Sequence, residues 1–311
     1  MSNSLLHEKW GVIANPIAGK RKQKNLLQQL EALLKSNGIT FEIHLTQYQR
    51  HATEIAEKCL HAGCKVLLVV GGDGTLNEVV NGVCRVCGEQ YSDITLALLP
   101  CGTGNDWARY WGMPRALAGF MQMILNGETK RIDLAKVTAS NLTDIHYYIN
   151  GLGIGYDAIV LKKTNWLKTI FGGWAWTYKL AVVLTLLEAR GKQMVISAHE
   201  VSHVDKFLTI AVGNGCYSGG GLKQVADADP TDGRLHVMAL KSLTPSSVFS
   251  IVKALFAGTL IDHPRVVHLV SKRVEFRLEK PAYAEADGIL LGMHDSYTIE
   301  ILPQSVNFLV P

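Results

Sequence analysis

The feature that most constrains this chain is a continuous apolar run, residues 66–70, followed at once by Gly71-Gly72-Asp73-Gly74-Thr75. The run is rich in β-branched residues, so it predicts a strand buried on both faces, as in a parallel sheet. The glycines let the backbone turn sharply and approach a ligand, and Thr75 and Asn77 are suited to cap a following helix. A strand, a glycine turn and a helix start form a typical phosphate-binding geometry, because N–H groups and the helix dipole converge there.

The polar residues of this turn favour a ligand over a plain strand-to-helix connection. Asp73 lies in the middle of the turn, where it is placed to face a metal-bound phosphate. Asn77, Glu78 and Asn81 add polar groups to the first turns of the helix.

A second candidate loop follows the first predicted strand, residues 10–14. It contains Asn15 and Gly19, which we expect to face phosphate, and a basic cluster comes next at Lys20, Arg21, Lys22 and Lys24. The lysines fit a second phosphate contact and a solvated helix start equally well.

In the first 130 residues, segments with the apolar pattern of a strand alternate with segments that have helical spacing. Leucines keep helical spacing from Leu26 to Leu34, with Gly38 as a C-terminal stop, and residues 53–61 predict a second helix. These helices separate the strands predicted at residues 10–14, 41–45 and 66–70. Such alternation predicts right-handed crossovers and a parallel sheet. Ligands of such sheets bind at the carboxyl ends of strands, where Asn15, Thr46 and Asp73 fall.

The strand predicted at residues 94–99 leads into a second turn of small and polar residues, residues 100–106. We expect this turn to lie beside the Asp73 turn, so that both hold one nucleotide. For Asn105 and Asp106, plain helix capping is the alternative.

After Gly127 the pattern changes to recurring strands with few helices, which indicates a second, mostly antiparallel domain. Two helical insertions interrupt it, around Lys179 and Lys253. Ordinary packing explains most of their apolar residues. One segment nevertheless mixes aromatic residues with lysines, as segments at membrane interfaces do, and it contains Trp166, Phe171, Trp174, Trp176, Lys162, Lys163, Lys168 and Lys179.

Composition excludes several classes of protein. A net charge of +4 with 19% charged residues is too small for a nucleic-acid-binding module, and 48% hydrophobic residues can build two cores in 311 residues. The N-terminus lacks the pattern of a secretory signal, and no apolar run reaches the ~20 residues of a spanning helix. We therefore expect a cytoplasmic protein with reduced cysteines, and we read the Cys84 and Cys87 pair as incidental.

The motif GGDGTLNEVVNG resembles the nucleotide-binding motif of the diacylglycerol-kinase catalytic-domain family, which includes sphingosine and ceramide kinases and soluble bacterial lipid kinases. GGDGT alone is shared with NAD kinases and phosphofructokinases, whereas LNEVVNG and GTGND are narrower. Further matches follow in the same order along the chain: Asn15-Pro16 with Gly19, residues 100–107, residues 150–155, Gly213-Asn214 with residues 219–221, Asp232-Gly233 and Asp287-Gly288.

The resemblance implies specific roles for the matching residues. Asp287 is implied as the general base, with Asp73 as the second catalytic residue. A structural Mg²⁺ is implied at Asp229, Asp232 and Arg234, although Ala226 stands where the family commonly has proline. The predicted ATP-binding residues are Asn15, Gly19, Thr46, Gly71, Gly72, Asp73, Gly74, Thr75, Leu76, Asn77, Glu78 and Thr103.

The chain departs from the family after Asp287. The family motif continues with glutamate, whereas this chain has Asp287-Gly288-Ile289. Glu285 would lie on the same face of a strand as Asp287 and is a partial substitute, or else an ordinary exposed strand residue.

We therefore predict an α/β plus β protein. An N-terminal α/β ATP-binding domain with a mostly parallel sheet comprises residues 1–132, completed by residues 298–311. A mostly antiparallel β-sandwich domain for the lipid substrate comprises residues 133–297, with the nucleotide in the cleft between the domains.

The predicted activity is transfer of the γ-phosphate of ATP, with Mg²⁺, to a hydroxyl of a membrane lipid at a transiently contacted bilayer. Diacylglycerol, phosphatidylglycerol, a sphingoid base and a prenol all remain open as acceptors, and so does a homodimer. The alternatives are an NAD-kinase-like enzyme with a soluble substrate and a non-catalytic regulatory protein that binds nucleotide or lipid.

Overall fold

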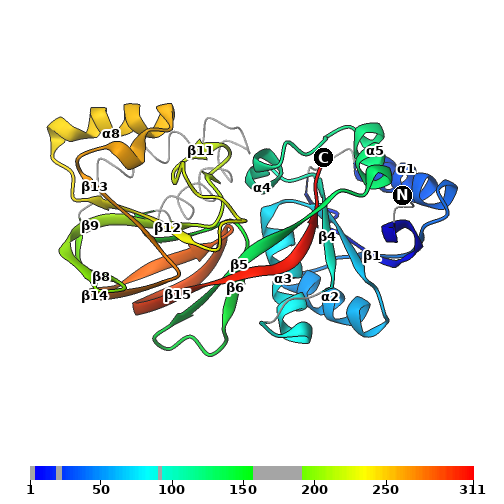
Figure 1. Cartoon of the computed structure of the whole chain (residues 1–311), viewed down its shortest axis with the longest axis horizontal. Coiled ribbons are helices and arrows are strands. Elements are labelled where there is room, and N and C mark those ends of the chain that lie inside the picture. The colour runs from blue at the N-terminus through cyan, green and yellow to red at the C-terminus, as the bar shows by residue number, and fades with distance from the viewer. Residues whose placement is uncertain (1–3, 19–22, 90–92, 157–190) are drawn as a thin grey trace. The chain divides into compact units, whose positions relative to one another are not determined.

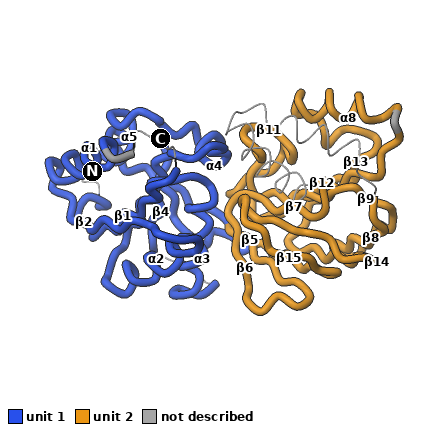
Figure 2. The backbone as a smooth tube through the Cα atoms, turned by 180° about the vertical axis from the view of Figure 1, so that it is seen from behind, with its two compact units in different colours: residues 1–133, 302–311 blue, residues 134–301 orange. Residues whose placement is uncertain are grey.

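The structure is a computed structural model that describes residues 4–18, 23–89, 93–156 and 191–311 (Figure 1). It is a mixed α/β protein with a large sheet-rich C-terminal region. The chain forms two compact units (Figure 2): Met1–Asp133 with Leu302–Pro311, and Leu134–Ile301. These boundaries lie one residue and four residues beyond those expected from the sequence.

Strands β1, β2, β3 and β4 of the first unit pair in parallel, in the order β2-β1-β3-β4. The end of β15 extends the row, because Asn307 and Phe308 pair in parallel with β4. Every residue of β3 is buried, as expected for a strand covered on both faces. The strands are β1 (Lys9–Ala14), β2 (Thr40–Leu45), β3 (Val66–Gly71), β4 (Thr95–Pro100) and the last part of β15 (Ile289–Leu309).

Helices connect these strands, as the leucine spacing predicted. A short 3-10 helix, η1 (Ser4–His7), precedes β1. The α-helices of the unit are α1 (Gln23–Ser36), α2 (His51–His61), α3 (Asp73–Cys87), α4 (Asp106–Tyr110) and α5 (Leu117–Asn126).

The second unit is built mainly from antiparallel pairs, in the order β13-β12-β9-β7-β14-β15. Its buried core includes Tyr148, Phe207, Phe276 and Tyr297. Its strands are β5 (Thr129–Ala139), which starts in the first unit, β6 (His146–Tyr148), β7 (Gly151–Gly155), β8 (Lys192–Ala198), β9 (Val201–Gly213), β10 (Tyr217–Ser218), β11 (Leu222–Lys223), β12 (Leu235–Lys241), β13 (Val266–Ser271), β14 (Arg273–Ala286) and β15.

Strands β7 and β8 both lie between β9 and β14 in the sheet. The second half of β9 pairs with β7, and its first half pairs with β8. Strand β14 likewise pairs with β8 through residues 275–278 and with β7 through residues 284–286. The two short strands therefore follow one another between the same two long neighbours.

The helical insertion expected around Lys253 is confirmed by α8 (Pro245–Ala257), which is followed by a 3-10 helix, η2 (Leu260–Asp262). The other insertion, with its aromatic residues and lysines, lies outside the described residues. The cleft expected between the domains stays a prediction.

Helices α2 and α3 pack so closely at Gly82 that a side chain there has no room. A Cβ atom on Gly82 would lie 2.6 Å from the Thr53 carbonyl oxygen and 2.8 Å from Ala56 Cβ. Glycine is therefore required for packing, although it is a poor helix former.

We expect Gly82→Ala to lower the free energy of unfolding by about 1–3 kcal/mol, because α2 and α3 must move apart. Urea unfolding monitored by circular dichroism measures this change. The control is Gly119→Ala in α5, where the nearest atom to a new Cβ is a side-chain carbon, Pro114 Cβ, at 3.2 Å. An equal or smaller loss in Gly82→Ala than in Gly119→Ala would contradict the packing argument.

Candidate functional site

The carboxyl ends of β1, β2 and β3 bring three predicted site residues to one edge of the first unit. The Asn15 N–H donates to the Val70 carbonyl (3.0 Å), and the Thr46 N–H donates to the Ala14 carbonyl (2.9 Å). The Asn15 side-chain amide also donates to Thr75 Oγ1 (3.2 Å). The structure thus joins the Asn15 loop to the Asp73 turn, as the sequence predicted, whereas Gly19 lies outside the described residues.

The two glycine turns at the ends of β3 and β4 are in backbone contact. A Cβ atom on Gly72 would lie 2.9 Å from Gly102 Cα, and one on Gly102 would lie 2.6 Å from Gly72 Cα. The Cys101 N–H donates to the Gly71 carbonyl (2.7 Å). The expectation that these turns lie side by side is therefore confirmed, and only glycine allows so close an approach.

Asn105 closes the second turn. Its side chain accepts the Gly102 N–H (2.9 Å) and donates to the Gly102 carbonyl (2.8 Å), and its own backbone is left-handed (φ 51°). Asparagine tolerates this conformation better than most residues. The side chain of Asn105 thus shapes the turn and does not cap α4.

The Asp73 carboxylate holds the start of α4. Its two oxygens accept the N–H groups of Asp106 and Trp107, each at 3.1 Å. Burial raises the pKa of Asp73, and these N–H groups act in the opposite direction. Facing a metal-bound phosphate stays a prediction for Asp73, and the structure adds a second role that the sequence did not reveal.

Glu78 has a structural partner that the sequence also did not reveal. Its carboxylate accepts the N–H groups of Arg50 (2.9 Å) and Ala52 (3.1 Å) at the start of α2. Arg50 precedes that helix in a left-handed conformation (φ 68°) and makes no side-chain cap hydrogen bond. Glu78 therefore replaces a local cap from a neighbouring helix.

The remaining predicted ATP-binding residues differ in exposure. Asn77 and Leu76 are fully buried, and the Asn77 side-chain oxygen accepts a hydrogen bond from Asn81 (3.1 Å). Thr103 is exposed on the second turn. Leu76 and Asn77 are therefore not accessible to a nucleotide in this structure, whereas Thr103 is.

Asp287 lies in the second unit, in the two-residue turn between β14 and β15. Asp287 and Gly288 both have positive φ (48° and 83°), and Ala286 pairs with Ile289. Two positive φ values in a two-residue hairpin describe a type I′ turn, for which Asp-Gly is a preferred sequence. The Glu285 carboxylate accepts the Gly288 N–H (2.8 Å), so Glu285 supports this turn.

Three backbone N–H groups hold the Asp287 carboxylate. Ile149 donates to one oxygen (2.8 Å), and Asn150 (3.1 Å) and Gly151 (2.9 Å) donate to the other. We call these three groups the amide cradle. Burial, and then the negative charge of Asp287, raise the pKa of the neighbouring Tyr148 hydroxyl well above 10. Asp287, which is 8% exposed, is therefore an oriented carboxylate beside a neutral tyrosine.

The loop proposed for Mg²⁺ uses its carboxylates internally. Asp232 accepts the Arg234 N–H (2.8 Å) and contacts His236 Nε2 (2.9 Å), and Asp229 accepts the Thr231 N–H (3.0 Å). Among the described residues, no group of three or more His, Cys, Asp or Glu side chains is arranged to hold a metal ion. The Mg²⁺ site stays a prediction, and no chemical step is assigned to it.

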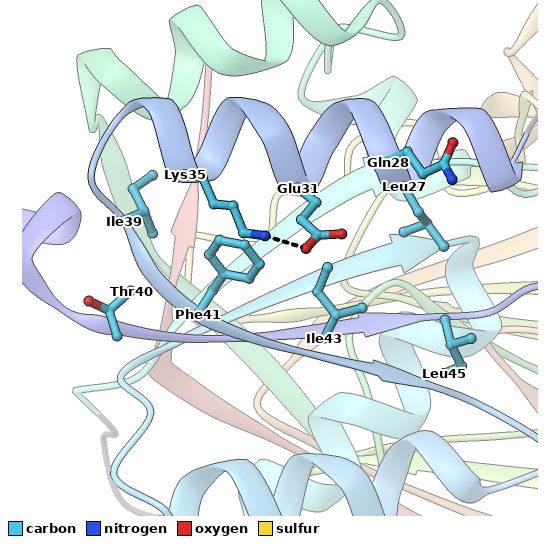
Figure 3. A pocket seen from close by; sticks show the side chains of 9 residues that line it. All are labelled: Leu27, Gln28, Glu31, Lys35, Ile39, Thr40, Phe41, Ile43 and Leu45. Atoms are coloured by element: carbon cyan, nitrogen blue, oxygen red, sulfur yellow. Dashed lines mark hydrogen bonds and ion pairs between the residues drawn. The ribbon is translucent and has the colours of Figure 1, made fainter.

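An apolar groove of about 730 Å³ runs between α1 and β2 (Figure 3). The Lys35 ammonium and Glu31 form an ion pair on the helix side (2.7 Å). The groove is lined by Leu27, Gln28, Glu31, Lys35, Ile39, Thr40, Phe41, Ile43 and Leu45. None of the predicted site residues is among them, so the groove is separate from the candidate site.

Comparisons with known proteins match both units. A model of the "Diacylglycerol kinase catalytic domain" matches residues 9–137, and a model of the "YegS C-terminal NAD kinase beta sandwich-like domain" matches residues 151–310. The diacylglycerol kinase of Staphylococcus haemolyticus (strain JCSC1435) is 27% identical over 278 residues, which cover 89% of this chain and 81% of the relative. The Staphylococcus aureus (strain MRSA252) diacylglycerol kinase is 26% identical over 89% of this chain and 84% of its own.

Solved structures share the fold. A protein from Bacillus anthracis str. Sterne superposes with a TM-score of 0.81 at 24% identity, and a diacylglycerol kinase from the same organism with 0.73 at 22%. Each match covers 98% of this chain and 97% of the other. In the described part of the chain, no helix is long and apolar enough to cross a membrane.

We expect Gly102→Ala to weaken nucleotide binding by at least tenfold, because a Cβ atom there would push the two glycine turns apart. Isothermal titration with ATP and Mg²⁺ measures the affinity, and thermal unfolding reports whether the fold survives. The control is Gly119→Ala, because Gly119, like Gly102, has no positive φ, and the nearest atom to its new Cβ is a side-chain carbon, Pro114 Cβ, at 3.2 Å. Wild-type affinity in Gly102→Ala would show that the nucleotide does not use these turns.

Proposed function

We propose that this chain phosphorylates a lipid hydroxyl with ATP, because it belongs to the diacylglycerol kinase family. Its first unit matches the diacylglycerol kinase catalytic domain, and its second matches the YegS C-terminal NAD kinase beta sandwich-like domain. It is a kinase by membership of this family. The ATP donor and the lipid acceptor are the proposed parts.

The contact between the Gly72 and Gly102 turns carries the proposal. The start of α3 directs the positive end of its dipole to this edge of the sheet, where a polyphosphate is stabilised. The N–H groups of Cys101, Gly102, Asp106 and Trp107 are bonded within the protein, so the second turn contributes its close approach to the first and not these donors. Asn15 and Thr75, which hydrogen-bond to each other, add polar side chains at the same edge. ATP is proposed to enter as its Mg²⁺ complex, with Mg²⁺ written as part of the substrate.

The reaction needs a group that accepts the proton of the attacking hydroxyl. The hydroxyl oxygen forms a bond to the γ-phosphorus, the bond from that phosphorus to the bridging oxygen breaks, and ADP leaves. Asp287 is proposed to receive the proton, because the amide cradle fixes its carboxylate in one orientation. Catalysis of this kind rests on positioning and on stabilising charge.

The acceptor is proposed to be a membrane lipid, as the names of the relatives suggest. Diacylglycerol, phosphatidylglycerol, a sphingoid base and a prenol differ mainly outside the reacting hydroxyl. The test is transfer of labelled phosphate from ATP to a total lipid extract in mixed micelles, with identification of the labelled product. Labelling of NAD in place of lipid would support the soluble-substrate alternative, and ATP binding with no transfer would support the regulatory one.

We expect Asp287→Asn to lower the transfer rate by roughly two to four orders of magnitude with little change in ATP affinity, as for loss of a general base. Asparagine fits a type I′ turn, but its NH2 group would face a cradle N–H that now has an acceptor, so thermal unfolding must show that the variant is folded. Steady-state kinetics with the identified lipid measure both effects. Glu285→Gln, which keeps one acceptor for the Gly288 N–H, is the neighbouring control and should be mild. Full activity of Asp287→Asn would defeat the assignment.

Peripheral contact with an anionic membrane is proposed from the lysine and aromatic pattern of residues 162–179. Replacing Lys162, Lys163 and Lys168 by alanine should weaken binding to anionic vesicles, and added salt should weaken wild-type binding. Vesicle sedimentation measures both effects. Equal binding by the triple variant would show that these lysines do not contact the bilayer.

A homodimer stays a prediction that analytical ultracentrifugation can check.

A further inference from the structure

Two peptide groups of the amide cradle are held from both sides. The peptide between Ile149 and Asn150 donates its N–H to Asp287 (3.1 Å), and its carbonyl accepts the Asn214 side-chain amide (2.6 Å). The peptide between Asn150 and Gly151 donates its N–H to Asp287 (2.9 Å), and its carbonyl accepts the backbone N–H groups of Asn214 (2.9 Å) and Gly215 (2.7 Å). Asn214 therefore contacts both peptide groups opposite Asp287.

A peptide group is planar, with its N–H and C=O pointing in opposite directions. Fixing the carbonyl of such a group therefore fixes the direction of its N–H. A carbonyl that accepts a hydrogen bond also polarises the group, which strengthens the N–H as a donor. The contacts of Asn214 thus set both the direction and the strength of two of the three hydrogen bonds to Asp287.

The arrangement is buried and specific to asparagine. Asn214 is fully buried, and Asn150 is 6% exposed. The contact to the Ile149 carbonyl needs a side-chain N–H donor, which an aspartate lacks. The Asn150 side-chain amide donates to the Tyr217 carbonyl (2.9 Å), which adds a further hydrogen bond between the segment before β7 and the segment after β9.

We propose that Asn214 is a positioning residue of the kinase: through the peptide groups that join Ile149 to Asn150 and Asn150 to Gly151, it holds the Asp287 carboxylate in the orientation that receives the proton of the acceptor hydroxyl. The inference rests on the proposed function, because it assigns a role to Asp287 in the transfer step. A structural role alone would join the segment after β9 to the segment before β7 and leave the chemistry unaffected.

The first test is Asn214→Ala in the full-length enzyme. It removes the hydrogen bond to the Ile149 carbonyl and frees one peptide group to tilt. We expect kcat to fall by about ten- to a hundredfold, the range for a misplaced catalytic group, while the KM for ATP stays unchanged.

Asn150→Ala is a second, gentler variant, because its side-chain oxygen accepts no hydrogen bond within the described structure. It should also lower kcat without changing the KM for ATP.

Thr209→Val is the matched control. Thr209 is buried in β9, which ends one residue before Asn214, and its hydroxyl donates to the carbonyl of Ile154 in β7 (3.3 Å), away from the cradle. The change removes a side-chain hydrogen bond to a backbone carbonyl, as Asn214→Ala does. Thermal unfolding should show a comparable loss of stability, whereas kcat should remain that of the wild type.

A double-mutant cycle separates positioning from structure. If Asn214 acts through Asp287, then adding Asn214→Ala to Asp287→Asn should cause no further loss of kcat. If its role is structural, the two losses should multiply. An unchanged kcat in folded Asn214→Ala or Asn150→Ala, or multiplying losses in the cycle, overturns the inference.

Failure of the proposed function has a different signature. A fully active Asp287→Asn enzyme removes the role of Asp287 and the positioning role together. An inactive Asp287→Asn enzyme with a fully active Asn214→Ala enzyme removes only the positioning role.

Discussion

Buried or half-buried carboxylates that accept backbone N–H groups hold several loops of this protein in place, including those of the candidate site. Asp73 holds the start of α4, Glu78 the start of α2, and Asp287 the amide cradle. Asp133, which is fully buried, accepts the N–H of Gln304 (2.7 Å) in a left-handed bend of β15 (φ 51°). A hydrogen bond to a charged group contributes about 1.5–3 kcal/mol, and a loop that loses its acceptor leaves donors unsatisfied.

The same contacts explain how far the sequence predicted the candidate site. The position of each glycine turn followed from the apolar strand before it, because burial and turn chemistry are local properties. The partners of the carboxylates did not, because Asp73 and Glu78 bond to segments more than 25 residues away. The residue types predicted polar groups at these positions, whereas the fold determines which carboxylate oxygens accept backbone N–H groups.

Helices and strands were likewise predicted where the pattern is local, and missed where the element depends on neighbouring strands. The alternation of strands and helices in the first unit was predicted well, because helical and strand spacing differ clearly. Strand β7 was recognised only as a motif, since its glycines, Gly151, Gly153 and Gly155, lack the side chains that mark a strand. Its pairing with β9 and β14 comes from those neighbours and not from its own composition.

Strands β7 and β8 lie one after the other between the same two neighbours, and this arrangement leaves the length of the connection between them unconstrained. Both of its ends enter strands that are fixed by the same two neighbours, so the length of the connection is independent of the register of β9 and β14. We expect a change in the length of that connection to leave the hairpin of Asp287 in place, because β14 keeps its pairing with both short strands.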